Sequence, residues 1–417
     1  MNSSDADRFL IFSSAGLRAV AIGMTGVMLA LHLAVLGMDA WLLGLVIALG
    51  LAGNAVGTFL VTFVADRMGR RGTLVALALL MAVGGFLLAS SSMPGVVMVA
   101  AFFGMVNGMG RDRGAATTIE QALLPLTARD AERTKVFAWY NVTVDAGHAL
   151  GSLLGGVPAL LRVHAGMPVL GSYQLAWMLY GVLCLLAGFL SLRLSTVLEL
   201  RERPSPVRLS PHSRKVVVRF AALSGVDSLG GGFLTTALIG YWFFQRFGAN
   251  EVTLAPLFFS MRILNGLSHL AAAALARRFG LVNTMVWTHL PSSLLLMTVP
   301  FAPNLPVAIA LFLIREALVE MDVPTRQSYL MAVVRNEERT RASGVTNLTR
   351  NVCWAVAPAV AGMLMKTLSV SAPLVVGPGL KIAYDLLLLK VFRHVKPLEE
   401  QVKRAPGKRY TTAQSIA

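Results

Sequence analysis

The 417-residue chain is too apolar to be a soluble protein of its size. Hydrophobic residues make up 55% of it and charged residues only 14%, whereas soluble chains carry about 25% charged residues. Twelve membrane helices of about 25 residues would use about 300 positions and leave the remainder for loops and tails. The composition therefore predicts an all-helical integral membrane protein and excludes a string of soluble domains.

The chain also carries an excess of basic residues, with 37 Lys and Arg against 21 Asp and Glu and a formal charge of +16. A nucleic-acid partner would require a basic face on a soluble module, whereas in a membrane protein Lys and Arg collect on the cytoplasmic loops. Cys184 and Cys353 each lie in an apolar run, so neither a disulfide framework nor a metal site is predicted.

Apolar stretches recur with short polar breaks along nearly the whole chain. They predict membrane helices over residues 12–37, 42–64, 72–92, 94–124, 135–161, 171–195, 216–244, 251–276, 282–301, 305–333, 342–365 and 373–392. The longest break contains three prolines and separates the first six helices from the last six. We therefore expect an N-terminal six-helix bundle over residues 1–195, a cytoplasmic linker over 196–215, a C-terminal six-helix bundle over 216–392 and a cytoplasmic tail over 393–417.

The basic residues are distributed unevenly between alternate loops. The loops on the side of the N-terminus hold almost all of them, whereas the opposite loops hold only Arg162, Arg246 and Lys366. This asymmetry predicts that both termini are cytoplasmic, and it accounts for the net charge without nucleic acid.

The two halves also resemble each other. Residues 132–135 read Glu-Arg-Thr-Lys and residues 338–341 read Glu-Arg-Thr-Arg, an offset of 206, and at the same offset Asn141 matches Asn347. A duplicated six-helix unit is typical of secondary transporters.

A charged motif lies between the second and third predicted helices, where residues 62–71 read Thr-Phe-Val-Ala-Asp-Arg-Met-Gly-Arg-Arg. In this place the motif resembles that of the major facilitator superfamily, Gly-x-Leu-Ala-Asp-Arg-x-Gly-Arg-Arg/Lys, although Thr62 and Val64 depart from it. The resemblance, supported by the twelve spans and the repeat, implies two pseudo-symmetric six-helix bundles. It also implies a cytoplasmic gate in which Asp66 approaches the start of the eleventh helix. The predicted gate motif comprises Asp66, Arg67, Gly69, Arg70 and Arg71. Alternatively, its basic residues could serve only to orient the protein in the membrane.

The fifth predicted helix carries a run of glycines, namely Gly147, Gly151, Gly155 and Gly156. Their spacing places the first three on one helix face, which allows close approach of a neighbouring backbone. In the superfamily a similar run that also contains proline is associated with proton-driven exporters, but Ser152 stands where the proline belongs. The run favours export, and ordinary helix packing is the alternative.

Charged residues within the predicted spans point to a working site, because each costs at least about 2.5 kcal/mol at the bilayer centre. The resemblance implies that helices 1, 4, 7 and 10 line a central cavity, and these helices hold most of the intramembrane charges. Asp145, Arg262, Arg350, Lys381 and Asp385 lie in other helices and are not explained in this way, and Asn265, His269 and His289 are expected to be structural. The predicted proton-coupling and substrate residues are Arg18, Arg111, Asp112, Arg113, Glu120, Asp227, Arg315, Glu316, Glu320 and Asp322.

Helical spacing sorts these charges further. Arg113 and Glu120 should share a face of helix 4, and Arg315, Asp322 and Arg326 should form one stripe on helix 10. Glu316 and Glu320 lie one turn apart and should repel each other, so one of them is the first choice for a residue that takes up a proton; Asp112 and Asp227 come next.

Arg18 and Asp227 occupy corresponding places in the two halves. We expect them to pair across the pseudo-two-fold axis, either in one state of the transport cycle or as a permanent structural pair.

These observations predict a secondary active transporter that moves a small organic solute by alternating access, with proton-coupled export favoured. The expected protein is a monomer in the cell inner membrane, with the lipid bilayer and protons as its other partners. The alternatives are a proton-coupled importer or facilitator of a charged metabolite, a metal or metalloid exporter, and a non-transporting sensor. The sequence contains no phosphate-binding loop and no hydrolase motif, so we expect neither an enzyme nor a cofactor.

Overall fold

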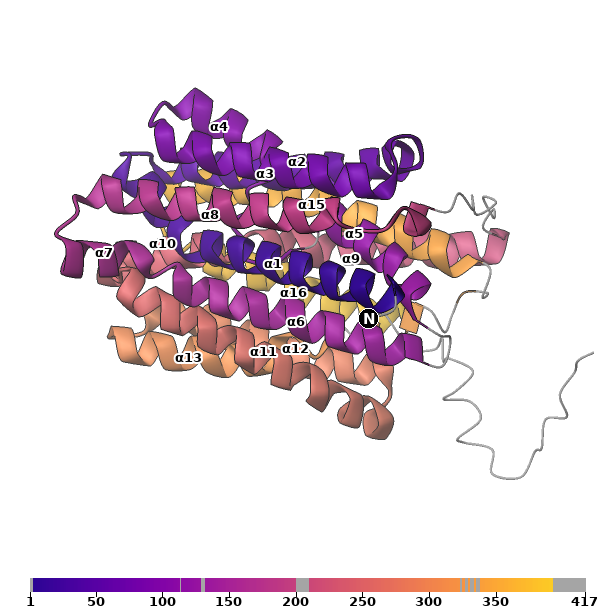
Figure 1. The fold of residues 1–417 in the computed structure, drawn as a ribbon. Helices are drawn as coiled ribbons and strands as arrows, with labels where there is room; N and C mark the ends of the chain where they lie inside the picture. Colours follow the sequence, from indigo (N-terminus) through magenta and orange to yellow (C-terminus); the bar gives the residue numbers. More distant parts are fainter. Residues whose placement is uncertain are drawn as a thin grey trace, which may run out of the picture.

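The computed structural model describes residues 3–112, 114–128, 132–199, 210–322, 325–326, 329–330, 334 and 338–392. Over these residues the chain forms long helices that run along one common direction, with no β-strand (Figure 1). Helix occupies part of every range in which a membrane span was expected. The predicted tail and residues 200–209 of the predicted linker lie outside the described residues, and the first helix of the second half begins at Pro211, inside the expected linker.

The helices of the first half overlap the predicted ranges. They are α1 (Ser3–Val35), α2 (Ala40–Met68), α3 (Arg70–Ser90), α4 (Pro94–Phe103), α5 (Ala115–Leu123), α6 (Arg133–Leu154), α7 (Val157–Ala165) and α8 (Val169–Leu192), with short 3-10 helices η1 (Leu124–Thr127) and η3 (Thr196–Glu199).

The second half is built in the same way. Its helices are α9 (Pro211–Gly232), α10 (Thr236–Phe247), α11 (Glu251–Phe279), α12 (Leu281–Thr298), α13 (Leu305–Val319), α15 (Arg339–Thr367) and α16 (Pro373–Phe392), with the 3-10 helix η4 (Val299–Phe301).

Seven segments of the described chain are long and apolar enough to cross a membrane. They are Ser4–Val35, Ala40–Val61, Arg70–Ser90, Lys135–Ala165, Val169–Leu192, Ser213–Phe247 and Arg341–Thr367.

The prediction of one continuous helix over residues 94–124 is wrong. The helix stops after Phe103 and resumes at Ala115, and the intervening chain includes Gly110 at φ 60° and Met105 at φ 51°. Residues 104–114 contain four glycines, and glycine both weakens a helix and permits positive φ. Arg113, which was expected to share a helix face with Glu120, lies outside the described residues.

Two further cavity helices are also interrupted. The seventh predicted helix divides into α9 and α10 after three consecutive glycines, 230–232, and Thr235 caps the new helix by accepting a hydrogen bond from the Leu238 N–H. In the tenth, α13 ends at Val319. Pro324 follows in the sequence and cannot donate the backbone hydrogen bond that the Glu320 carbonyl would accept in a continuous helix.

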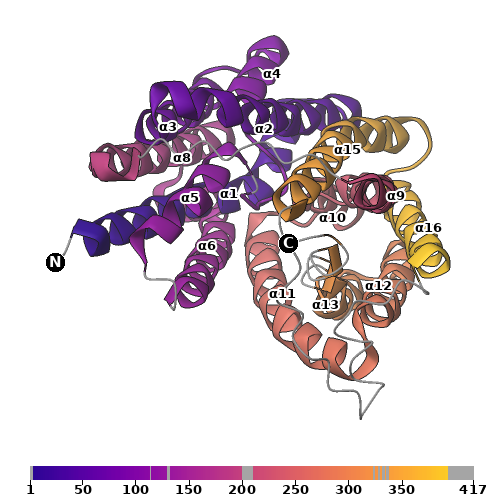
Figure 2. The same cartoon turned by 90° about the vertical axis from the view of Figure 1, so that its right-hand side faces the viewer.

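The two halves lie side by side, and the contacts between them are mainly those of α2 with α15 and of α6 with α11 (Figure 2). We call the end of the bundle that contains Ser3 and Met68 the proximal end, and the end that contains the α1–α2 loop the distal end (Figure 1).

The glycines of α6 pack this helix against α1 of the same half. A Cβ atom on Gly147 would lie 2.7 Å from the Ala19 Cβ, and one on Gly155 would lie 2.6 Å from the Val27 Cβ. Gly151 faces Gly23 with similar closeness, while Gly156 lies near Ala255 of α11. The run therefore allows close packing of the chain around the end of α6 against α1 and α11.

The halves are joined at the distal end. Lys366 at the end of α15 pairs with Asp39 at 2.7 Å, and Arg162 of α7 pairs with Glu251 of α11 at 2.6 Å. A Cβ on Gly44 of α2 would lie 2.9 Å from the Cα of Gly362 of α15, so the two backbones touch. These contacts close the distal side of the bundle.

Candidate functional site

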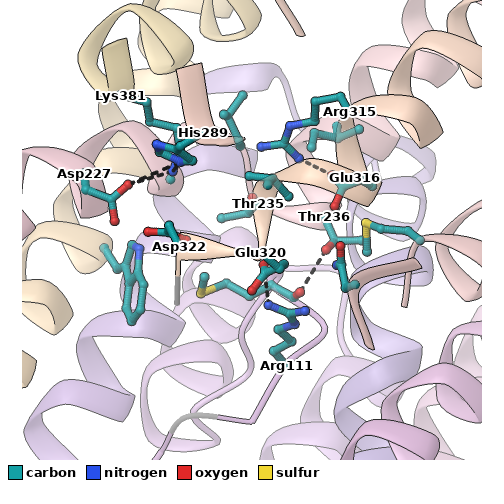
Figure 3. A pocket seen from close by; sticks show the side chains of 18 of the residues that line it. Arg111, Asp227, Thr235, Thr236, His289, Arg315, Glu316, Glu320, Asp322 and Lys381 are labelled. Carbon is teal, nitrogen blue, oxygen red and sulfur yellow. Dashed lines mark hydrogen bonds and ion pairs between the residues drawn. The ribbon is translucent and has the colours of Figure 1, made fainter. Parts of the chain in front are cut away.

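A polar cavity of about 120 Å³ lies at the level where the interrupted helices meet. Asp227 and Lys381 lie on one side of it and Arg315 and Glu316 on the other, with Glu320 and Arg111 between them (Figure 3). Most of its wall comes from the C-terminal half, and Met109 and Arg111 come from the interruption of the fourth helix. Its charged residues are Arg111, Asp227, Arg262, Arg315, Glu316, Glu320, Asp322, Arg326, Arg350 and Lys381.

The chain between α4 and α5 is held in place by the second half of the protein. The carbonyl of Gly108 accepts from the Ala237 N–H at 2.8 Å, and the carbonyl of Met109 accepts from Thr236 and from Arg262, each at 2.8 Å. A backbone carbonyl without a partner inside a membrane costs several kcal/mol. Side chains and backbone of α10 and α11 therefore make the interruption possible, and the same bonds place Arg111 in the cavity.

Arg18 lies at the centre of a buried cluster in the N-terminal half. Its Nε donates to Asp112 Oδ2 at 2.6 Å, and its two terminal nitrogens donate to the two oxygens of Glu120 at 2.6 and 2.5 Å. Tyr140 donates to Glu120 at 2.7 Å, and the Asp112 N–H donates to His148 Nε2 at 2.8 Å. None of these residues lines the central cavity.

Asp227 lies at the centre of a second cluster, in the C-terminal half. Lys381 donates to its Oδ1 and Arg326 to its Oδ2, both at 2.8 Å. Arg326 also donates to Asp322 at 2.9 Å, and His289 lies 3.0 Å from both oxygens of Asp385. Arg18 and Asp227 therefore do not form a permanent pair, because in this structure each finds partners of opposite charge within its own half.

Glu320 joins the two halves at the cavity. Its Oε1 accepts from Arg111 Nη1 at 2.6 Å, and its Oε2 lies 3.4 Å from His269 Nε2. The His269 side chain is 35% exposed and that of Glu320 is 16% exposed, so this carboxylate has the most open surroundings of the cavity acids in the described part of the chain.

Glu316 has a separate set of partners. Arg315 donates to it directly, and Asn265, in the amide orientation that satisfies both of its ends, donates to Glu316 at 3.0 Å and accepts from Arg111 at 3.2 Å. The repulsion expected between Glu316 and Glu320 is thus offset, because each carboxylate has its own arginine.

Many of the residues that line the cavity were predicted from the sequence, but others were not. Of the predicted residues, Arg111, Asp227, Arg315, Glu316, Glu320 and Asp322 line it, whereas Arg18, Asp112 and Glu120 do not. Asn265 and His289, expected to be structural, also line it, as do three charges on helices that were not expected to form it: Arg262, Arg350 and Lys381. Their presence in apolar spans was the available signal, because an intramembrane charge needs a partner or a function.

Only one group of described side chains has the spacing of a metal site, namely Asp227, His289 and Asp322. Lys381 and Arg326 occupy the oxygens of Asp227, and a divalent cation would have to displace both charges. These residues therefore fit an ion-pair network better than a metal ion.

The gate motif lies at the proximal end, where α2 ends and α3 begins. Asp66 and Arg67 are in the final turns of α2, but their side chains lie outside the described residues. Gly69 adopts φ 81° in the sharp turn between the helices, which glycine allows, and Arg71 donates to the Leu194 carbonyl at 3.3 Å.

Comparison with known proteins agrees with this architecture. The family model described as Major Facilitator Superfamily matches residues 11–358. The "Uncharacterized membrane protein YJR124C" of Saccharomyces cerevisiae is 26% identical over 95% of this chain and 96% of its own length.

Among solved structures, the nucleoside transporter NupG superposes with a TM-score of 0.71 at 14% identity, over 94% of this chain and 100% of its own. A bacterial homologue of the human lysosomal transporter Spinster, in an inward-facing and unoccupied conformation, superposes with a TM-score of 0.66 at 12% identity, over 94% and 95% of the two chains. The structural matches show the shared fold. The family model, which covers most of the chain, shows that the protein belongs to the major facilitator superfamily.

Proposed function

We propose that the protein moves a small organic solute by alternating access, with the central cavity as its binding site and a proton gradient as its energy source. The observation that carries this proposal is the position of the cavity. Its wall comes mainly from the C-terminal half and is completed by Met109 and Arg111 of the N-terminal half, and three interrupted helices bring charged side chains together there. Discontinuous helices of this kind form the substrate sites of several transporter folds.

The pair formed by Glu320 and Arg111 supports proton coupling. It joins the C-terminal half to the N-terminal half at 2.6 Å, and Glu320 contacts the partly exposed His269. Uptake of a proton by Glu320 would remove its attraction for Arg111 and loosen the contact between the halves. A protonation step would thereby change the balance between the two states of the transporter.

Reconstitution into liposomes tests this proposal. A thermal-shift screen of metabolites first identifies a solute, because a bound ligand stabilises the folded protein. Glu320→Gln should then abolish accumulation driven by an imposed pH gradient while counterflow of labelled solute continues. Asp5→Asn, on the exposed start of α1, is the control and should accumulate normally. Gradient-driven accumulation by Glu320→Gln with the wild-type pH dependence would refute the coupling role, and absence of counterflow in the wild type would refute transport.

The direction that we propose is export in exchange for protons, with the glycine run of α6 as its support. The alternative is proton-coupled import. Vesicles of known orientation distinguish them: export requires solute to move towards the side from which protons enter, and movement of both in the same direction would establish import.

We further propose that a monomer functions in the cell inner membrane with both termini in the cytoplasm, so that the closed distal end faces outwards. The ion pairs of Asp39 with Lys366 and of Arg162 with Glu251 support an inward-facing state. Asp66→Asn should favour this state further by weakening the proximal gate. Cysteines placed at the proximal end should then react faster with a membrane-impermeant thiol reagent, and an unchanged rate would refute the gate role of Asp66.

A further inference from the structure

We infer that the substrate of the central cavity is a small organic anion, held by the guanidinium groups of Arg262 and Arg315. The inference rests on the proposed function only in taking this cavity as the substrate site. It follows from the balance of charge, from two buried N–H groups and from the size of the cavity.

The cavity wall carries more positive than negative charge. Six basic and four acidic side chains line it. All four acids already have basic partners: Lys381 and Arg326 for Asp227, Arg326 for Asp322, Arg315 for Glu316 and Arg111 for Glu320. With six basic and four acidic side chains, the wall carries a net excess of two positive charges. A site of this kind attracts ligands of negative charge.

Arg262 is one of the arginines that line the cavity. It is 8% exposed, and no carboxylate lies within salt-bridge distance of it in the described part of the chain. Its Nη2 donates to the carbonyls of Met109 and Gly110 at 2.8 and 3.0 Å, and its buried Nε has no acceptor within the described chain. These backbone bonds fix the guanidinium in place without neutralising its charge.

Arg315 presents a second incomplete guanidinium. It is 6% exposed and donates through Nη1 to the adjacent Glu316, while its buried Nε has no acceptor among the described residues. Buried polar groups are nearly always hydrogen-bonded, so two such N–H groups on the wall of one cavity call for an acceptor. The planar fork of an arginine matches the oxygens of a carboxylate or phosphate, which form strong charge-assisted bonds with it.

The rest of the wall favours an organic ligand of few atoms. The volume of about 120 Å³ is about ten times the 10–15 Å³ that one water molecule needs. Leu234, Ile239, Met261 and Val319 provide apolar surface, and the hydroxyl groups of Thr235 and Thr236 lie on the same wall. A short carbon skeleton with a carboxylate or phosphate group satisfies both kinds of surface.

Binding to the purified full-length protein in detergent tests the inference. Sodium succinate and sn-glycerol 3-phosphate are the anionic probes, and succinamide is a neutral probe with the same skeleton as succinate. We expect at least one anion to raise the unfolding temperature and to give a measurable Kd by calorimetry, with no effect of succinamide. Preference for succinate or for glycerol 3-phosphate distinguishes a carboxylate site from a phosphate site.

Variants assign the binding to the two arginines. Arg262→Gln should weaken anion binding at least tenfold, as should Arg315→Gln combined with Glu316→Gln, which avoids leaving an unpaired carboxylate. Arg246→Gln, at the exposed end of α10, is the matched control and should bind as the wild type does. Arg262→Lys retains the positive charge but lacks the planar guanidinium group. If Arg262→Gln does not fold, Arg262→Lys replaces it as the test variant, and it should likewise bind the anion more weakly than the wild type.

Equal stabilisation by succinamide, no response to either anion, or unchanged Kd values in the folded variants would overturn the inference. The assay requires neither a membrane nor a gradient. A protein that binds anions without catalysing counterflow would therefore refute the proposed transport and leave the anion site standing.

Discussion

The two halves of the molecule hold their buried charges in opposite ways. In the N-terminal half a cation, Arg18, lies between the acids Asp112 and Glu120, whereas in the C-terminal half an anion, Asp227, lies between the cations Lys381 and Arg326. The positions correspond, since Arg18 and Asp227 lie on the first helix of each half and Glu120 and Arg326 are related by the repeat offset of 206. The repeated scaffold thus retains an ion pair between its first and fourth helices while reversing its polarity.

The surroundings of the two clusters differ as well. The spaces beside Arg18 and Asp112 measure about 10 Å³ each, and one water molecule needs about 10–15 Å³. Asp227, Lys381 and Arg326 line the cavity of about 120 Å³. From this difference we expect a division of labour between the two clusters: the Arg18 cluster stabilises the N-terminal half, and the Asp227 cluster contributes to binding of the solute.

The largest effect on stability is expected for Glu120→Gln. This change leaves Arg18 with one acid instead of two in a site closed to water, and breaking a buried ion pair costs about 3–5 kcal/mol. The free energy of unfolding, measured by denaturant titration in mild detergent, should fall by an amount in this range. Asp5→Asn, which removes the exposed pair with Arg8, is the control. A loss below about 1 kcal/mol would contradict a stabilising role for the Arg18 cluster.

A smaller effect on stability, but a larger one on transport, is expected for Asp227→Asn. Water or ligand in the cavity can solvate the remaining cations, and Arg326 still has Asp322. Counterflow should fall at least tenfold, with a loss of unfolding free energy smaller than that of Glu120→Gln. If Asp227→Asn instead unfolded the protein more readily than Glu120→Gln and left counterflow intact, the division of labour would be reversed.

The smallest effect is expected for Lys366→Gln at the distal end. The side chains of Lys366 and Asp39 are 54% and 43% exposed, and an exposed pair of this kind contributes less than about 1 kcal/mol. The hydrogen bond from Lys366, aided by that from the Leu42 N–H, lowers the pKa of Asp39 below its usual value. The stabilisation is therefore present above the ordinary aspartate pKa and is lost as the pH falls through the lowered pKa.

Measurement of unfolding at several pH values checks this prediction. The difference between the wild type and Lys366→Gln should disappear in acid, and it should shrink in high salt because exposed charges are screened. A difference that persisted at low pH or in high salt would show that Lys366 stabilises the distal end by another means.

The sequence predicted the fold better than it predicted the site. Apolar runs of sufficient length marked helices in all twelve expected ranges, because a membrane span must satisfy its own backbone. Side-chain pairing depends on contacts between segments far apart in the chain, and so the partners of Arg18 and Asp227 could not be read from spacing. The interruption at 104–114 could have been predicted from its four glycines, and the contributions of Arg262 and Lys381 from their cost in the membrane. Their location in the cavity required the packing of α11 and α16.

The interrupted fourth helix has a consequence for how the protein is made. α4 has 10 residues and α5 has 9, and neither alone can cross a bilayer that requires about 20 helical residues. The Gly108 and Met109 carbonyls between them bond to Ala237, Thr236 and Arg262, which are synthesised more than 120 residues later. The backbone of the interruption can therefore gain these hydrogen-bond partners only after the second half has been synthesised.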